Sequence, residues 1–280
     1  MPLRWRSAGQ GSKFQLGCAG ALSNVLSNLN YAANGGDVTD ISRMLGVSLG
    51  EMLSVPLYDC FGERVNKVIK LRREPWNLFT LGWTGFGYRS RAADEHYCAY
   101  RGTFPTGRNQ SHEEHYQADQ HWVDFVANCA AAAETMLFAI SILANFAEPG
   151  TFPDDTESGL RRSREDIAKR IATAFPATPL AEAVSVHFTA ASDGQALFEV
   201  RDVVLHRGRL PRLLSLGGSK HGQTAVPVNP KALPGDWLYD RVLDINSLAA
   251  WRSWFCSMAP QVIHGATALL ITVENRLEAT

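Results

Sequence analysis

The sequence predicts an all-α protein, a helical bundle preceded by an N-terminal helical extension. Three observations support this fold class. Apolar residues recur at helical spacing along most of the chain, as at Leu22, Val25 and Leu29. Helix start signals stand before several of these segments, and Gly or Pro follows them. With 280 residues, 45% of them hydrophobic, the chain can bury a large core.

Residues 1–107 are expected to form the N-terminal extension. The periodicity predicts helices over residues 16–33, 40–45 and 49–73, and Pro75 is expected to stop the third. Residues 76–107 are rich in glycine and aromatic residues and receive no assignment.

Residues 108–280 are expected to form the bundle. Ser111, followed three residues later by Glu114, is a capping box and predicts a long helix that ends near residue 146. A helix is expected over residues 160–174. Another, over residues 180–189, would have Thr178 as its N-cap and Pro179 at its first position.

The last third of the chain contains two further helices separated by a loop. A second capping box, Ser192 to Gln195, predicts a helix that ends at Gly208. Residues 213–236 contain many glycines and prolines and are expected to form a long extended loop. A final helix is predicted over residues 247–277.

Charge and cysteine content narrow the classes of protein. Lys and Arg number 27 against 28 Asp and Glu, which argues against a protein coated in nucleic acid but leaves room for a local basic site. The five cysteines form no C-x-x-C pair, as is typical of reduced thiols in a cytoplasmic protein. The apolar run at residues 136–147 is short for a membrane span and favours a buried helix, so we expect no association with a membrane.

The predicted helix that ends at Gly208 contains the most informative motif. Arg201 projects from the middle of an apolar helix face, so its guanidinium must be paired, or lie in a cleft or at a subunit interface. Asp202 and His206 are four residues apart and therefore adjacent, and the carboxylate would orient the ring and favour its protonated form. Further basic residues form a cluster suited to binding RNA phosphates: Arg207, Arg209 and Arg212.

The spacing within this motif sets a geometric condition. In a regular helix Arg201 and His206 point about 140° apart. They would converge on one phosphate if the last helical turn were loosened, or if a second subunit completed the site.

The run of Arg201, Asp202, three further residues and then His206-Arg207-Gly208, late in an all-α chain, resembles the R-x4-6-H motif of the HEPN superfamily. The resemblance implies a helical bundle that forms a homodimer. It also implies a metal-independent endoribonuclease of a toxin–antitoxin, CRISPR-associated or phage-defence system. The family's catalytic residues transfer onto Arg201, Asp202 and His206, where Asp202 replaces the more frequent Asn and adds a negative charge.

The resulting hypothesis is RNA cleavage without a metal or other cofactor. His206 would act as general acid or base, and Arg201 would stabilise the phosphorane, giving a 2′,3′-cyclic phosphate. The partners would be single-stranded RNA, a second copy of the chain and an antitoxin or regulatory protein. The alternative is a non-catalytic helical module that binds RNA, a nucleotide or a protein partner and keeps the Arg–His pair for structure.

Histidines near the start of the long helix suggest two readings. His112, His115 and His121 accompany two glutamates and would form a metal site if they shared a face. His121 points away from His115, and neither zincin order is present, so a solvated, acid-rich first turn is the favoured interpretation.

Two groups of aromatic residues also allow alternatives. Residues 82–91 mix glycines, aromatics and arginines; they suit base stacking, but a structured turn that packs its aromatics into the bundle is favoured. Trp251, Trp254 and Phe255 lie on one side of the last predicted helix, where core packing is expected and a dimer interface is the alternative.

Overall fold

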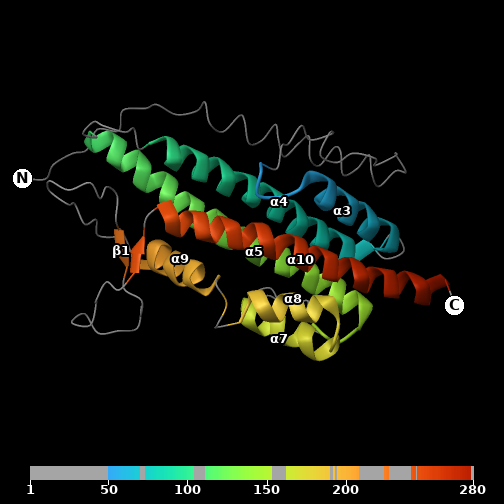
Figure 1. Cartoon of the computed structure of the whole chain (residues 1–280). Coiled ribbons are helices and arrows are strands. Elements are labelled where there is room, and N and C mark those ends of the chain that lie inside the picture. The colour runs from blue at the N-terminus through green and yellow to red at the C-terminus, as the bar shows by residue number, and fades with distance from the viewer. Residues whose placement is uncertain are drawn as a thin grey trace, which may run out of the picture. The chain divides into compact units, whose positions relative to one another are not determined.

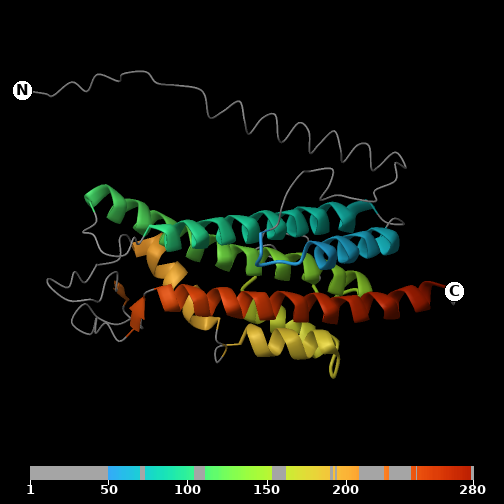
Figure 2. The ribbon, with the colours of Figure 1, turned by 45° about the horizontal axis from the view of Figure 1, so that its top comes forward.

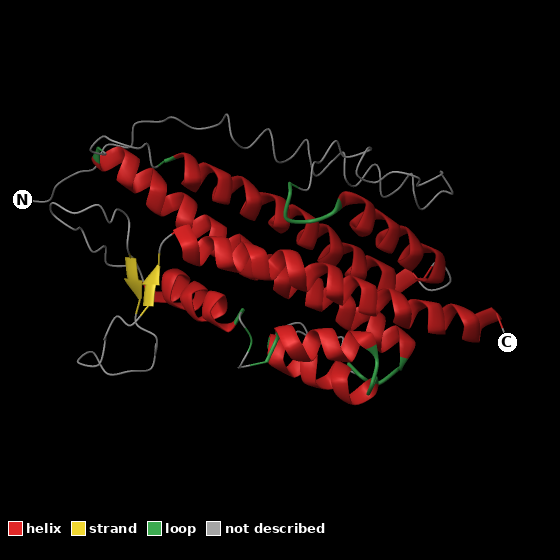
Figure 3. Ribbon diagram, viewed as in Figure 1, coloured by secondary structure: helices red, strands yellow, loops and turns green. Residues whose placement is uncertain are grey.

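The described part of the protein belongs to one compact unit, which runs from Ser48 to Thr280. The structure is a computed structural model, and it describes residues 50–69, 73–103, 111–152, 162–189, 192, 194–207, 224–226, 241–243 and 245–278. Within these ranges it contains seven helices and two three-residue strands, which confirms the all-α prediction (Figure 3). The helices expected over residues 16–33 and 40–45 lie outside the described residues.

Helix α5, His112–Ala147, is the central element of the bundle. Its N-terminus forms the predicted capping box: the Ser111 side chain accepts from the Glu114 backbone N–H, and the Glu114 carboxylate accepts from the Ser111 N–H. Its longest shared interface is with α4, Arg73–Gly102, and it also contacts α10, Ile245–Glu278. Figures 1 and 2 show these three long helices side by side.

The N-terminal predictions need two corrections. The helix expected over residues 49–73 is shorter, because α3 spans Val55–Ile69. Pro75 stops no helix; it lies in the first turn of α4, where the missing N–H has no intrahelical partner to lose. The unit that begins at Ser48 contains α3 and α4 together with the later helices. The domain boundary expected between residues 107 and 108 lies outside the described residues and stays a prediction.

Residues 76–102, which the sequence left unassigned, are helical despite four glycines. The missing side chains allow close packing: a Cβ at Gly82 would lie 2.8 Å from the Phe138 ring, and one at Gly87 would lie 3.0 Å from Tyr58. Trp83 and Phe86 are 5% and 0% exposed. Trp83 and Phe86 thus pack in the core as favoured, but from a helix rather than from a turn.

Helices α7 and α8 follow the predicted pattern on the other side of α5. Helix α7 spans Arg164–Ala174, and α8 spans Pro179–His187. Thr178 caps α8, accepting from the Ala181 backbone N–H, and Pro179 occupies the first turn. Helix α8 then packs on α10.

Helix α9, Gln195–Arg207, carries the Arg–His motif and packs against α5. The Gln195 side chain does not make the bond that a second capping box requires. Its Oε1 accepts from Arg164 Nη2 at 3.1 Å, and its Nε2 donates to Glu199 Oε1 at 3.2 Å. The Gln195 side chain therefore bonds to Arg164 at the start of α7 and does not cap its own helix.

Strands β1, Thr224–Val226, and β2, Arg241–Leu243, form an antiparallel pair. The prediction of an extended loop over residues 213–236 is therefore wrong at residues 224–226. Val226 faces Arg241 in the register, and Thr224 faces Leu243. Branched and apolar residues favour pairing of even such short segments, which glycine and proline content alone does not predict.

Two of the described helices pass a length-and-composition test for crossing a membrane, α5 over His112–Ala147 and α10 over Ile245–Asn275. Core helices of soluble proteins pass the same test, and 61% and 50% of the two apolar windows are buried within the bundle. Trp251, Trp254 and Phe255 of α10 are 6%, 7% and 0% exposed, which confirms the expectation of core packing.

Candidate functional site

Arg201 lies on the side of α9 that faces α5 and is paired there with Glu134. The guanidinium makes two parallel contacts with this carboxylate, Nη2 to Oε1 at 2.5 Å and Nη1 to Oε2 at 3.2 Å. The Arg201 side chain is 18% exposed to solvent, and the Glu134 side chain is 35% exposed. Two hydrogen bonds in a fork are the strongest arrangement that an arginine and a carboxylate make.

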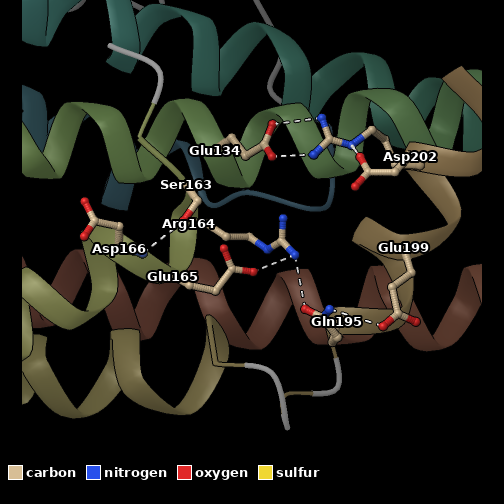
Figure 4. Close-up of polar contacts among 9 residues, drawn as sticks. Glu134, Ser163, Arg164, Glu165, Asp166, Gln195, Glu199 and Asp202 are labelled. Carbon is tan, nitrogen blue, oxygen red and sulfur yellow. Dashed lines mark hydrogen bonds and ion pairs between the residues drawn. The ribbon is translucent and has the colours of Figure 1, made fainter. Parts of the chain in front are cut away.

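A second carboxylate reaches the same guanidinium. Arg201 Nε lies 2.9 Å from Asp202 Oδ1, an ion pair without the alignment of a hydrogen bond. Figure 4 shows Glu134 on α5 and Asp202 on α9, the two carboxylates that contact this guanidinium. One positive charge therefore stands against two negative charges, and the group carries a formal charge of about −1 at neutral pH.

This geometry answers the question that the sequence posed about Arg201. Of the three environments expected for this guanidinium, an ion pair, a cleft or a subunit interface, the structure shows the ion pair. Glu134 was visible in the sequence as the single charge in the long stretch between Asp124 and Glu148. Such a charge needs a partner, and this was the signal that could have linked the two residues.

The structure extends α9 through Arg207, so the backbone of His206 belongs to the helix. Five residues of regular helix turn the Cα–Cβ direction of residue 206 about 140° away from that of residue 201. The side chains of His206 and Arg207 lie outside the described part, as do Arg209 and Arg212 entirely. The expected contact between Asp202 and His206 stays a prediction.

A second polar group links the start of α7 to the start of α9. Arg164 Nη2 lies 2.8 Å from Glu165 Oε1 and donates to Gln195 (Figure 4). The guanidinium carbon of Arg164 lies 4.0 Å from the Phe198 ring centroid. Its side chain is only 13% exposed. Sequence reasoning missed this arginine, because nothing local marks a contact with a ring 34 residues away.

The histidines of α5 do not assemble as a metal site. Among the described residues, no group of three or more His, Cys, Asp or Glu side chains is placed to hold a metal ion. His112 is exposed, in keeping with a solvated first turn. His121 is partly buried and lies against His96 of α4, a contact that the sequence did not predict.

The glycine- and aromatic-rich segment presents few groups for base stacking. Tyr88 is 67% exposed, whereas Trp83 and Phe86 are buried in the core. Arg89 donates to Asn128 Oδ1 at 2.9 Å, and Arg91 pairs with Glu95 at 2.6 Å. Both arginines are thus engaged within the bundle surface.

The likeness to HEPN proteins depends on a short motif, so a match over a longer stretch would carry more weight. No protein-family model, curated protein or solved structure matches this chain.

Proposed function

We propose that this protein is a non-catalytic helical module that acts by binding a partner, and that Arg201 is a structural residue within it. The observation that carries the proposal is the fork between Arg201 and Glu134, with Asp202 on the remaining side of the guanidinium. An arginine that stabilises a phosphorane must offer N–H groups to the phosphate oxygens. Here two of the five N–H groups donate to Glu134 and Nε faces Asp202, so two carboxylates lie where phosphate oxygens would have to bind, and they would repel a phosphate.

Among the partners that the sequence left open, charge favours a protein over RNA or a nucleotide. The chain has a formal net charge of −1, and nucleic-acid binding draws its affinity from an excess of positive charge. The Arg201 group adds no positive charge of its own, because two carboxylates surround it.

A metal-independent endoribonuclease is the competing candidate, with Arg201, Asp202 and His206 as its catalytic residues. The observation in its favour is that the Arg201–Glu134 pair reaches the surface, with 18% and 35% of the side chains exposed. RNA would have to displace Glu134, and a second subunit would have to bring a His206 to the phosphate. The two candidates differ in whether Arg201 acts on a substrate or on Glu134.

A double-mutant cycle on Arg201→Met and Glu134→Gln measures the structural role. We expect a coupling free energy of unfolding of about 1 to 2 kcal/mol, because each single variant leaves a partly buried polar group without its partner. Exposure of Glu134 keeps the value below that of a fully buried pair. Chemical denaturation monitored by circular dichroism gives the four free energies.

Glu199→Gln is the matched control for this cycle, since Glu199 lies on α9 and bonds to Gln195 rather than to Arg201. Its coupling with Arg201→Met should stay within about 0.5 kcal/mol. Equal couplings for Glu134 and Glu199 would contradict the structural role of the fork.

The functional test is incubation of purified protein with total RNA in the presence of EDTA. The proposal expects intact RNA with the wild type and with His206→Ala alike. Fragments ending in a 2′,3′-cyclic phosphate that form with the wild type and disappear with His206→Ala would establish the endoribonuclease instead.

A further inference from the structure

Two histidines meet across the interface between α4 and α5. His96 Nδ1 and His121 Nδ1 are 3.2 Å apart, and the ring centroids are separated by 5.5 Å. A bond between two ring nitrogens needs one N–H and one lone pair, so a single proton lies between them. If both rings were protonated, two N–H groups and two positive charges would face each other at this distance.

An acidic residue sits beside one of the two rings. His96 Nε2 lies 3.8 Å from Asp124 Oδ2, with 29% and 37% of these side chains exposed. One positive charge on His96 is therefore compensated by Asp124, and His96 can at the same time donate from Nδ1 to a neutral His121. Among the described residues, Asp124 is the one carboxylate paired with these two rings, so the site accommodates one added proton but has no second carboxylate for another.

Charged groups on the neighbouring elements are engaged elsewhere. On α4, Glu95 pairs with Arg91, and on α10 the guanidinium of Arg252 bonds to Asp94. His96 and Asp124 are the charged groups whose influence reaches the His121 ring. The pKa of His121 is lowered from 6.5, first by burial and then by the positive charge of His96, while Asp124 opposes the shift.

We propose that His96 and His121 form a proton-sensitive latch between α4 and α5. The latch holds when one proton is shared between the two rings, and it is released when both rings are protonated. Release would loosen the end of the bundle where α4 leads into α5, independently of whether the protein is a binding module or a nuclease.

The direction of the pH effect follows from proton linkage. A histidine with a lowered pKa in the folded state binds fewer protons there than in the unfolded chain, so acid favours unfolding. The stabilisation is complete above the ordinary pKa of 6.5 and is lost as the pH falls below it toward the lowered pKa of the folded state.

Thermal unfolding at pH 8 and pH 5 tests the latch. Wild-type protein should lose about 2 to 4 °C more in Tm between these pH values than His121→Gln, whose side chain accepts a hydrogen bond but does not titrate. His264→Gln is the matched control, because His264 is an exposed histidine of α10, and it should lose as much as the wild type. Equal losses for the wild type and His121→Gln would overturn the proposal.

A measurement on the unsubstituted protein covers the case in which His121→Gln does not fold. The ring protons of His121, followed by NMR from pH 8 to pH 4.5, should titrate below 6.5. His96→Gln should raise the midpoint of this titration, because it removes the positive charge that faces the His121 ring. A single step at an ordinary histidine pKa in the wild type would show that no proton is shared.

Discussion

Asp94→Asn is expected to lower the free energy of unfolding by about 2 to 4 kcal/mol, because Asp94 is a buried carboxylate with cationic and backbone partners. It is 5% exposed; its Oδ1 accepts from Arg252 Nε at 2.9 Å, and its Oδ2 accepts from the Glu51 backbone N–H at 2.6 Å. An asparagine has one acceptor oxygen, so its NH2 group would face one of these two donors. The partly buried Arg252 would also lose the negative charge that balances it.

The state of Arg252 agrees with this expectation. Burial opposes its charge, yet the hydrogen bond and the attraction of Asp94 hold the pKa of Arg252 above its ordinary value. Asp94 also joins three segments, since Glu51 precedes α3 and Arg252 belongs to α10. Removing one charge therefore weakens contacts across the unit rather than at one point.

The adjacent residue provides the control for Asp94→Asn. Glu95 is exposed on the same helix and pairs only with Arg91 among the contacts described for it, so Glu95→Gln should cost less than about 0.5 kcal/mol. Urea denaturation of both variants measures the difference. Similar losses for Asp94→Asn and Glu95→Gln would contradict the account of this ion-pair network.

Gly265→Ala is expected to destabilise the protein by about 2 to 3 kcal/mol, because it overpacks the contact between α10 and α8. A Cβ at position 265 would lie 2.6 Å from both the Cα and the N of Leu180 and 2.9 Å from the carbonyl carbon of Pro179. These are backbone atoms in the first turn of α8, so no side-chain rotation relieves the clash. The two helices would have to move apart along their shared face.

Gly102→Ala controls for the general effect of alanine in a helix. A Cβ at Gly102, the last residue of α4, has nothing within 4 Å. This variant should leave the stability unchanged or raise it by up to about 1 kcal/mol. If Gly265→Ala proved as stable as Gly102→Ala in thermal and urea unfolding, the close approach of α8 and α10 would be refuted.

Local signals were sufficient to predict the helices that begin with a cap. Ser111 and Thr178 each accept a bond from an N–H in the first turn, as the sequence indicated, and α5, α7 and α8 end close to the expected residues. These signals depend on neighbours within four residues, which a sequence displays directly.

The errors arose where distant residues decide the structure. Gly82 and Gly87 suggested a turn, but they serve close packing against Phe138 and Tyr58, which are far away in the sequence. For the same reason the Arg201 fork and the His96–His121 contact could not be read from spacing alone. The residue types indicated that each group needs a partner, and only the packing of the helices identified the partner.

Incubation with total RNA in EDTA tests the central claim, that this chain acts by binding while Arg201 supports the fold. Wild type, Arg201→Met and His206→Ala, purified in parallel, should all leave the RNA intact, and Arg201→Met should differ from the wild type in stability. RNA cut to 2′,3′-cyclic phosphate ends by the wild type, and by neither variant while both remain folded, would contradict the claim.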